Sequence, residues 1–183
     1  MGSIADEVIA LFTQKGSDAY FGEDVSQLEH ALQAALFATQ EGATNALIVA
    51  ALLHDVGHLV EGTPENIADL GVDAMHEEIG KRWLSARFSE DIVEPVHLHV
   101  GAKRYLCATD LTYFQKLSAA SVKSLELQGG PMTEEETANF ERNKFYKDAV
   151  ALRRWDDKAK VQGLQTPPLA SYRNIVDEEA SRK

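Results

Sequence analysis

Apolar side chains recur every three or four residues along most of this chain, which is the spacing of helices that bury one face. The first such pattern, carried by Ile4, Val8 and Phe12, predicts a helix that ends near Gly16. The alternating pattern typical of strands is almost absent. The chain is therefore predicted to be all-α.

Capping sequences mark the next helix boundaries. Ser26 and Glu29 form a capping box, and the helix that they open should end at Gly42. Residues 46–60 are apolar on nearly every side. A helix of that kind is buried all round, so this segment is predicted to be the central helix of the fold.

Further turn and cap signals divide the rest of the chain. They predict a long loop from Gly62 to Gly71, a helix capped by Asp73, a helix capped by Ser89 that Pro95 kinks or breaks, a helix over residues 111–127, a long helix from the Thr133–Glu136 capping box through Trp155 towards Lys160, and a short C-terminal helix after Pro167 and Pro168. No internal repeat or linker interrupts the series. Residues 1–183 are therefore expected to form a single domain, a bundle of six or more helices around one central helix.

The charge balance excludes some classes of partner. The chain carries 29 acidic and 18 basic residues, a net charge of −11. A nucleic-acid-binding protein would show a basic face, as would a protein bound to an anionic membrane, so neither partner is expected. A small anionic ligand remains compatible, because a few local cations can outweigh distant surface charge. Composition predicts nothing about protein partners.

Cysteine usage and the first residues indicate the compartment. Cys107 is the only cysteine, so the chain can form no internal disulfide. Residues 1–7 lack the basic start and apolar stretch of a signal peptide. The longest apolar run, residues 46–53, is too short to span a bilayer. A cytoplasmic protein is therefore expected.

Two strong metal ligands, His54 and Asp55, stand side by side in the most apolar segment. Burying Asp55 as an unpaired ion would be very costly, and a metal cation would neutralise it. An aspartate beside a histidine can also bridge two metals while its neighbour binds one of them. His58 follows four residues after His54, on the same face of the expected helix. In the alternative interpretation His54 caps a carbonyl and Asp55 bonds a helix end, and this pair alone does not decide between the two.

Other histidines and acids favour the metal interpretation. A lone histidine is more often a core or surface residue than a ligand, but here four expected helices could each supply one to a common centre, and imidazole with carboxylate suits iron, manganese or zinc. Either Asp156 or Asp157 could complete the set, since adjacent helical positions point about 100° apart and only one can face the centre. Trp155 favours Asp156 weakly. The six histidines are His30, His54, His58, His76, His97 and His99.

Two basic pairs adjoin these candidate ligands. Lys103 and Arg104 follow the His99 segment, and Arg153 and Arg154 precede Trp155. On position alone they are two solvated basic faces. If the ligands are correct, Lys103 and Arg153 stand where they could hold an anionic group of a substrate, arginine through paired hydrogen bonds and lysine as a point charge.

The order His…His-Asp…His…His…Asp resembles the HD-domain superfamily in its form with six ligands and two metals. Within it, the chain resembles the mixed-valence di-iron oxygenases that cleave carbon–phosphorus bonds, which include the glycine-forming 2-amino-1-hydroxyethylphosphonate dioxygenases and relatives that act on the trimethylammonio analogue. The resemblance runs from about residue 20 to about residue 160. Its most specific strings are residues 103–106 and 129–132; it also rests on residues 27–30, 50–58, 99–106, 128–132 and 155–158.

The resemblance implies a ligand set. It assigns one iron to His30, His54 and Asp156, and the other to His76 and His99, with Asp55 bridging the Fe(II)/Fe(III) pair. It matches no ligand to His97, which is expected to be a bystander.

Substrate residues are likewise implied by the resemblance and not by spacing. It groups His58, Lys103, Ser121 and Arg153 around the phosphonate. Tyr20 lies in a loop before the first ligand helix, where it can occupy an iron when substrate is absent, and Glu23 would meet the nitrogen of the substrate. The resemblance assigns no role to Asp24, but this residue could add a second negative charge beside Glu23. The catalytic residues expected from this assignment are Tyr20, Glu23 and His58.

The implied reaction is oxygen-dependent cleavage of the C–P bond of a small zwitterionic organophosphonate. The expected substrate is an (R)-1-hydroxy-2-(trimethylammonio or amino)ethylphosphonate, which yields phosphate and glycine betaine or glycine. The extra acid Asp24 favours the trimethylated form slightly, because a diffuse quaternary cation suits a pocket with aromatic and carboxylate groups.

Two other functions remain open. The main alternative is an HD-type phosphohydrolase, in which two metals activate a water that attacks a phosphate ester or nucleotide. The ligand set alone does not separate this reaction from the oxygenase. A third possibility is a degenerate HD domain that serves as a nucleotide sensor or helical scaffold, which the retention of every candidate ligand disfavours.

Overall fold

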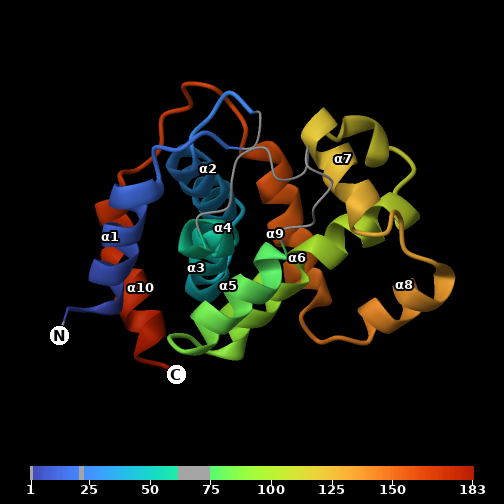
Figure 1. Cartoon of the computed structure of the whole chain (residues 1–183). Helices are drawn as coiled ribbons and strands as arrows, with labels where there is room; N and C mark the ends of the chain where they lie inside the picture. Colours follow the sequence, from blue (N-terminus) through green and yellow to red (C-terminus); the bar gives the residue numbers. More distant parts are fainter. Residues whose placement is uncertain (1, 21–22, 62–74) are drawn as a thin grey trace.

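Helices form nearly all the regular structure in this computed structural model, which describes residues 2–20, 23–61 and 75–183 (Figure 1). Within those ranges one isolated antiparallel bridge, between Ala19 and Ser26, is the exception. The prediction of an all-α fold is confirmed. The elements are α1 (Ile4–Lys15), α2 (Gln27–Gln40), α3 (Asn45–Leu53), α4 (Val56–Glu61), α5 (His76–Ser85), α6 (Glu90–Thr109), η2 (Phe114–Lys116), α7 (Ala119–Leu127), α8 (Glu134–Glu141), α9 (Tyr146–Lys158), η3 (Leu169–Tyr172) and α10 (Arg173–Ala180).

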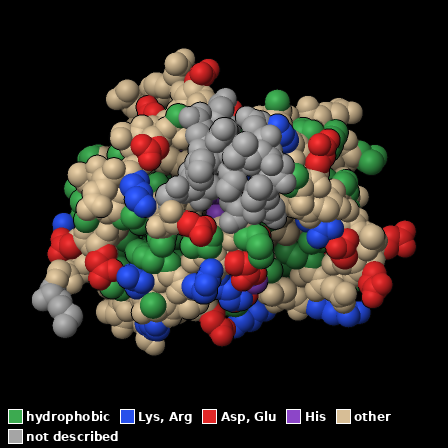
Figure 2. Space-filling view, viewed as in Figure 1, with side chains coloured by type: hydrophobic (Ala, Val, Ile, Leu, Met, Phe, Trp, Pro, Cys, Tyr) green, Lys and Arg blue, Asp and Glu red, His purple; other side chains and the backbone are tan. Residues whose placement is uncertain are grey.

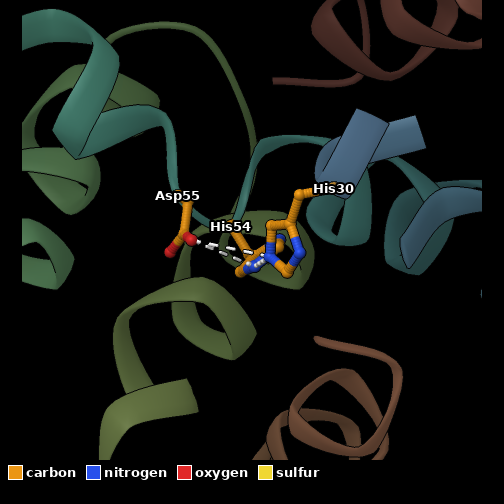
Figure 3. A group of neighbouring side chains, drawn as sticks. All are labelled: His30, His54 and Asp55. Carbon is orange, nitrogen blue, oxygen red and sulfur yellow. Dashed lines mark hydrogen bonds and ion pairs between the residues drawn. The ribbon is translucent and has the colours of Figure 1, made fainter. Parts of the chain in front are cut away.

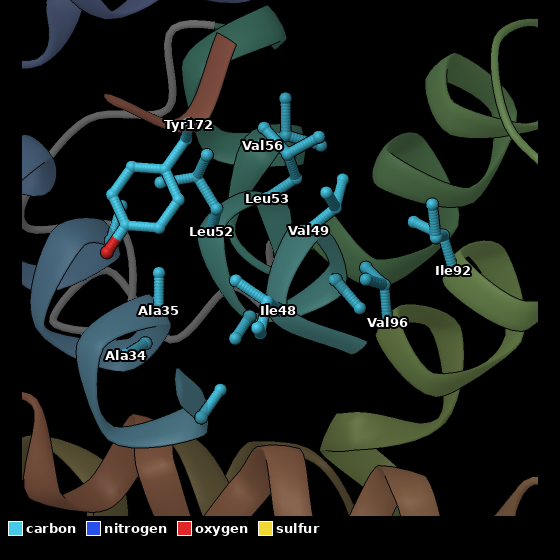
Figure 4. Packing of buried hydrophobic residues seen from close by; sticks show 14 of the residues in the cluster. Ala34, Ala35, Ile48, Val49, Leu52, Leu53, Val56, Ile92, Val96 and Tyr172 are labelled. Atoms are coloured by element: carbon cyan, nitrogen blue, oxygen red, sulfur yellow. The ribbon is translucent and has the colours of Figure 1, made fainter. Parts of the chain in front are cut away.

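The apolar helix α3 lies at the centre of the fold, as predicted. Every residue from Leu47 to Leu53 is buried. The helix packs against α2, α6, α9 and α10, so its side chains meet neighbours on all sides (Figure 4). Helix α10 packs beside α1 and helps to cover α3 (Figure 1). The end of α3 therefore brings whatever follows it into the middle of the molecule.

Several predicted boundaries are confirmed. Helix α1 ends at the Gly16 cap. Helix α2 opens at the Ser26–Glu29 capping box, and α8 opens at the capping box of Thr133 and Glu136. The expected loop of residues 62–71 and the Asp73 cap lie outside the described residues.

The central segment is two helices, and the prediction of one helix over residues 46–60 is wrong. The chain turns at His54 and Asp55 and resumes as α4. The Ala51 carbonyl, which would accept from the Asp55 N–H in a continuous helix, accepts a hydrogen bond from Nδ1 of His54, and the His58 N–H bonds the Asp55 carbonyl in a tighter turn. The turn allows His54 and Asp55 to face one centre, where adjacent helical positions would diverge.

The sequence predicted that Pro95 would kink or break its helix, and the structure shows that Pro95 does not break it. Helix α6 runs through it from Glu90 to Thr109. Proline removes the N–H that would bond the carbonyl of Asp91, but Asp91 is exposed, so water can satisfy that carbonyl. Ser89 is the N-cap residue, although its side chain makes no capping hydrogen bond. His99 and Lys103 consequently lie four residues apart on one continuous helix.

Two predicted helices are shorter than expected. Only residues 119–127 of the expected helix over 111–127 form α7, because Asp110 accepts hydrogen bonds from the N–H and hydroxyl of Thr112 and holds a turn there. The expected helix from Thr133 to Lys160 is divided into α8 and α9. Asn143 accepts from the Phe145 N–H between them, and this turn ends the first helix.

None of the helices in the described ranges combines the length and the apolar composition that a bilayer crossing requires.

Helices α4 and α5 cross closely at two glycines. A Cβ atom on Gly57 would lie 2.0 Å from the backbone oxygen of His76, far inside contact distance. A Cβ atom on Gly80, which faces Gly57, would meet nothing closer than 3.6 Å. Gly57 is therefore required for the approach that brings the start of α5 against α4, whereas Gly80 is not.

We expect Gly57→Ala to destabilise the protein and to displace His76, because backbone must move to admit the methyl group. Its melting temperature should fall by roughly 4 °C or more, the shift that corresponds to about 1–2 kcal/mol in a domain of this size. Gly80→Ala is the matched control and should melt at or above the wild-type temperature, since alanine favours helix by about 1 kcal/mol. Equal melting temperatures for the two variants, measured by circular dichroism, would contradict the close crossing.

Candidate metal centre

Four buried histidines from four parts of the fold converge on one point. His30 comes from α2, His54 from the end of α3, His76 from the first residue of α5 and His99 from the middle of α6. Figure 3 shows His30 and His54 with the Asp55 carboxylate beside them. Residues that are far apart in sequence are thus brought together where α3 ends.

Backbone carbonyls orient three of the four imidazole rings. Nδ1 of His30 lies 2.9 Å from the Ala159 oxygen, and Nδ1 of His54 lies 2.8 Å from the Ala51 oxygen. Nδ1 of His99 lies in the same way 2.6 Å from the oxygen of residue 96. Because a carbonyl only accepts, each Nδ1 carries the proton, and each Nε2 turns its lone pair to the centre, as in metal-binding histidines.

The Nε2 atoms then meet in two close pairs. Nε2 of His30 lies 3.0 Å from Nε2 of His54, and Nε2 of His76 lies 3.1 Å from Nε2 of His99. Two lone pairs at this distance repel unless a proton or a metal lies between them. Neighbouring ligands about 2.1 Å from one metal ion are themselves about 3 Å apart, so each pair has the spacing of two ligands on one metal.

Asp55 lies between the two pairs. Its Oδ2 is 3.6 Å from Nε2 of His30 and 3.5 Å from Nε2 of His54. Its Oδ1 is 3.4 Å from Nε2 of His76 and 3.6 Å from Nε2 of His99. Each oxygen thus faces one histidine pair. Two groups of three residues, which share Asp55, could each hold a metal ion.

Asp156 adjoins the first pair. Its Oδ1 lies 3.4 Å from Nε2 of His30 and 3.8 Å from Nε2 of His54. This oxygen is buried and accepts no hydrogen bond of ordinary geometry from the described residues. Asp157 instead bonds Arg153 and Tyr113. The structure therefore turns Asp156, and not Asp157, to the centre, in agreement with the weak preference from the sequence.

The centre requires positive charge. Burial would raise the pKa of Asp55, but the surrounding histidines, His54 foremost, hold it far below its usual range. Burial would lower the pKa of His54, yet the charges of Asp55 and Asp156 raise it to about 9, so without a metal this ring keeps an extra proton. A bound cation would displace that proton. The donor set fits a metal pair chemically, since imidazole and carboxylate together suit iron, manganese or zinc.

His58 and Tyr20 stack on two different histidines of the centre. The His58 ring stacks on His76 with centroids 4.1 Å apart, and burial lowers its pKa to about 4, so it is neutral. The Tyr20 ring stacks on His30 at 3.7 Å. Burial, and after it the charges of Asp55 and Asp156, raise the pKa of the Tyr20 phenol well above its usual value.

Lys103 is buried beside the centre, one helical turn beyond His99. Its Nζ donates to the hydroxyl of Ser124, 2.7 Å away. Burial and the nearby Arg153 guanidinium lower its pKa to about 7. This lysine is poised to change charge when an anion binds. Ser121, also buried, lies one turn before Ser124 on α7.

Arg153 also binds neighbouring side chains of the protein, a role that the sequence did not indicate. Its Nη1 lies 2.8 Å from Oδ2 of Asp156, its Nε donates to the Tyr113 hydroxyl at 3.1 Å, and its Nη2 bonds Asp157. Three of the five N–H groups of a guanidinium are thereby used, which leaves two for a ligand. Burial would raise the pKa of Asp156, but the Arg153 charge holds it well below its usual value.

The loop acids differ from each other. Glu23 is largely enclosed and forms an ion pair with Lys160, whose Nζ lies 3.1 Å from its Oε1. Asp24 is exposed. His97, expected to be a bystander, lies on the outer face of α6 with its Nε2 2.8 Å from a carboxylate oxygen of Glu78.

Reasoning from sequence missed Tyr113, Ser124 and Lys160 near the centre, and it considered Asp157 only as a candidate ligand and not as a partner of Arg153. Helical spacing could have linked Asp157 to Arg153, four residues earlier. The other three meet their partners only through tertiary packing. On the face shown in Figure 2, acidic and basic side chains are interspersed and hardly any histidine surface shows.

Comparisons with known proteins agree with this geometry. A family model described as HD domain matches residues 28–138. The chain is 48% identical over 175 residues to a hydroxymethylphosphonate dioxygenase from Gimesia maris. That alignment covers 94% of this chain and 87% of the relative. It is 43% identical over 175 residues to the [1-hydroxy-2-(trimethylamino)ethyl]phosphonate dioxygenase (glycine-betaine-forming) of Leisingera caerulea. That alignment covers 96% of this chain and 89% of the relative.

A third relative extends the family to a virus. The chain is 38% identical over 177 residues to the uncharacterized protein L432 of Acanthamoeba polyphaga mimivirus, with 95% of this chain and 80% of the relative covered. The resemblance drawn from the sequence is thus confirmed across nearly the whole chain. This protein belongs to the HD-domain family, in the branch that contains the phosphonate dioxygenases.

Proposed function

We propose that this protein uses a pair of irons and dioxygen to cleave the C–P bond of a small 1-hydroxyalkylphosphonate, releasing phosphate. The observation that carries the proposal is the arrangement of two histidine pairs, each facing one oxygen of Asp55. The relatives named as phosphonate dioxygenases supply the reaction class. Their printed names differ in one respect, because one substrate carries a trimethylamino group and the other does not.

The proposed ligands divide into two unequal sets around Asp55. His30, His54 and Asp156 would hold one iron, and His76 and His99 the other. The second iron would have fewer protein ligands, which leaves room for substrate or dioxygen. When bound, an iron pair supplies the redox chemistry with dioxygen that no side chain can perform.

The side chains beside the centre would hold the phosphonate. Lys103 offers an ammonium, Ser121 a hydroxyl, and Arg153 its two unused N–H groups. Phosphonate is a compact dianion, and charge-assisted hydrogen bonds from such groups bind it strongly. His58, neutral and stacked on His76, can accept or pass a proton at the edge of the centre. Tyr20 stacks on His30, a histidine of the other pair.

A metal-dependent phosphohydrolase is the second candidate, because the same ligands could activate a water. The oxygenase is preferred because both relatives with a named activity are dioxygenases.

The metal content tests the ligand assignment. Protein produced with iron should contain about two irons per chain, since two ligand groups share one carboxylate. Asp55→Ala should lose both irons, because each group loses its shared anion. Asp157→Ala is the control and should keep them, because Asp157 contacts Arg153 and Tyr113 instead of the histidines. Elemental analysis that found one iron or none in folded wild-type protein would refute the assignment.

Oxygen dependence separates the two candidate reactions. Iron-loaded protein should release phosphate from a 1-hydroxyalkylphosphonate in air and stop when oxygen is removed, because the C–P bond is broken by oxidation. It should also show the electron paramagnetic resonance signal of a mixed-valence iron pair. Anaerobic hydrolysis of a phosphate ester, with no oxygen-dependent release of phosphate, would support the phosphohydrolase instead.

Lys103 should control affinity for the phosphonate. Lys103→Met removes a charged hydrogen bond worth about 1.5–3 kcal/mol, so the KM should rise roughly tenfold or more. Iron content should be unchanged. Lys147→Met, at an exposed lysine of α9, is the matched control and should leave the KM unaltered.

The pH dependence gives a second check on Lys103. Its pKa of about 7 means that the fraction of charged lysine falls as the pH rises through 7, so the wild-type KM should rise there. Lys103→Met should lack that component, while ionisation of the substrate affects both proteins equally. Parallel profiles for wild type and variant would contradict a role for the Lys103 charge.

A further inference from the structure

Lys160 is held firmly at the edge of the metal centre. The Ala159 carbonyl, just before it, accepts from Nδ1 of His30, a proposed iron ligand. Just after it, Val161 forms two hydrogen bonds with the Gln33 side chain, N–H to Oε1 at 3.0 Å and carbonyl to Nε2 at 2.8 Å. Both partners lie on α2. The backbone on each side of Lys160 is therefore tied to the helix that supplies the first histidine.

Three polar side chains, including the proposed substrate residues Glu23 and Ser121, surround the Lys160 ammonium. Its Nζ lies 3.1 Å from Oε1 of Glu23, 3.2 Å from the Ser121 hydroxyl and 3.4 Å from the Ser118 hydroxyl. The side chains of Lys160 and Glu23 are 14% and 17% exposed, so the ion pair is shielded from water. Such a pair is stronger than one on the surface and harder to separate.

This ion pair lies near the Tyr20 ring, which adjoins the centre. Nζ of Lys160 is 5.9 Å from the centroid of the Tyr20 ring, and Tyr20 stacks on His30. The Tyr20 carbonyl also accepts from the Glu23 N–H at 2.8 Å. A substrate that reaches past Ser121, a proposed phosphonate contact, would therefore have its far end close to Lys160 and Glu23.

Charge then restricts what that far end can carry. An ammonium group of a substrate would need the Glu23 carboxylate as its partner, but that carboxylate is already paired with Lys160. A second cation at the same oxygens would be repelled by the lysine, and displacing the lysine would leave a partly buried ammonium without its counter-ion. A substrate with an uncharged far end would be neither repelled by Lys160 nor require its displacement.

We propose that Lys160 is a specificity-determining residue that takes the place of a substrate ammonium at Glu23, so that this protein selects hydroxyalkylphosphonates without a cationic group. The inference rests on the proposed function and deepens it. It favours a substrate of the hydroxymethylphosphonate kind over the aminated and trimethylated compounds that the loop acids suggested. Specificity of this kind comes from repulsion of the wrong ligand as much as from attraction of the right one.

Kinetic comparison of three substrates tests the proposal. Wild-type kcat/KM should be about tenfold or more higher for hydroxymethylphosphonate than for 2-amino-1-hydroxyethylphosphonate or its trimethylammonio analogue. Lys160→Met, which keeps the length of the side chain and removes its charge, should shift this ratio towards the ammonium substrates by about tenfold or more, because Glu23 is released. Adding Glu23→Gln to that variant should remove the gain.

Lys158→Met provides the matched control. Lys158 lies two residues away and pairs with Glu41 on the exposed surface, so its loss should leave the substrate ratio as in wild type. Iron content should be the same in all the variants. A wild-type preference for either ammonium substrate, or an unchanged ratio in Lys160→Met, would overturn the proposal.

A binding measurement separates failure of this inference from failure of the proposed function. Ethylphosphonate and 2-aminoethylphosphonate lack the reacting hydroxyl, so calorimetry can compare their affinities without turnover. Wild-type protein should bind ethylphosphonate more tightly, and Lys160→Met should reduce or reverse the difference. If that pattern holds but no hydroxyphosphonate is oxidised, the proposed function fails and the role of Lys160 stands. If oxidation occurs and wild type binds the amine more tightly, only the role of Lys160 fails.

Discussion

The buried negative charge of Asp55 is the constraint on which the rest of the centre depends. Its two oxygens face two different pairs of imidazole Nε2 atoms, and each pair is close enough to share one cation. A carboxylate in an apolar core is tolerated only when its charge is compensated. Without a metal the compensation falls to protons, as the raised pKa of His54 shows. Two metals would take over that compensation, because the Nε2 lone pairs of each histidine pair could then bind a cation.

The backbone is shaped to deliver ligands to that charge. The turn between α3 and α4 directs His54 and Asp55 to the same point, and Gly57 lets α5 approach until its first residue, His76, reaches the second oxygen. Helix α6 continues through Pro95 and so keeps His99 and Lys103 on one face. The most apolar part of the core thus holds the most polar site, because tight packing around α3 fixes the positions of its ends.

The end of α9 combines support of the metal site with selection of the substrate. Arg153 compensates Asp156 and keeps two N–H groups for an anion, while Asp157 holds the guanidinium in place. One turn beyond Asp156, Lys160 balances Glu23. Arg153 pairs with Asp156 and Asp157, and Lys160 pairs with Glu23, so each of these charges is neutralised by a neighbour. An incoming phosphonate would meet positive groups, and an ammonium would meet a site that is already balanced.

The sequence by itself determined the all-α class, the apolar central segment, most helix caps and the set of ligand-type residues, because these follow from periodicity and residue chemistry over a few positions. It could not determine the turn at His54 or the continuity of α6 through Pro95, and it gave only a weak preference for Asp156 over Asp157. Each of these depends on hydrogen bonds and packing with segments distant in the chain, as does the pairing of Glu23 with Lys160, 137 residues later. Spacing within one helix carries no information about which groups meet across the core, and only the tertiary structure decided that.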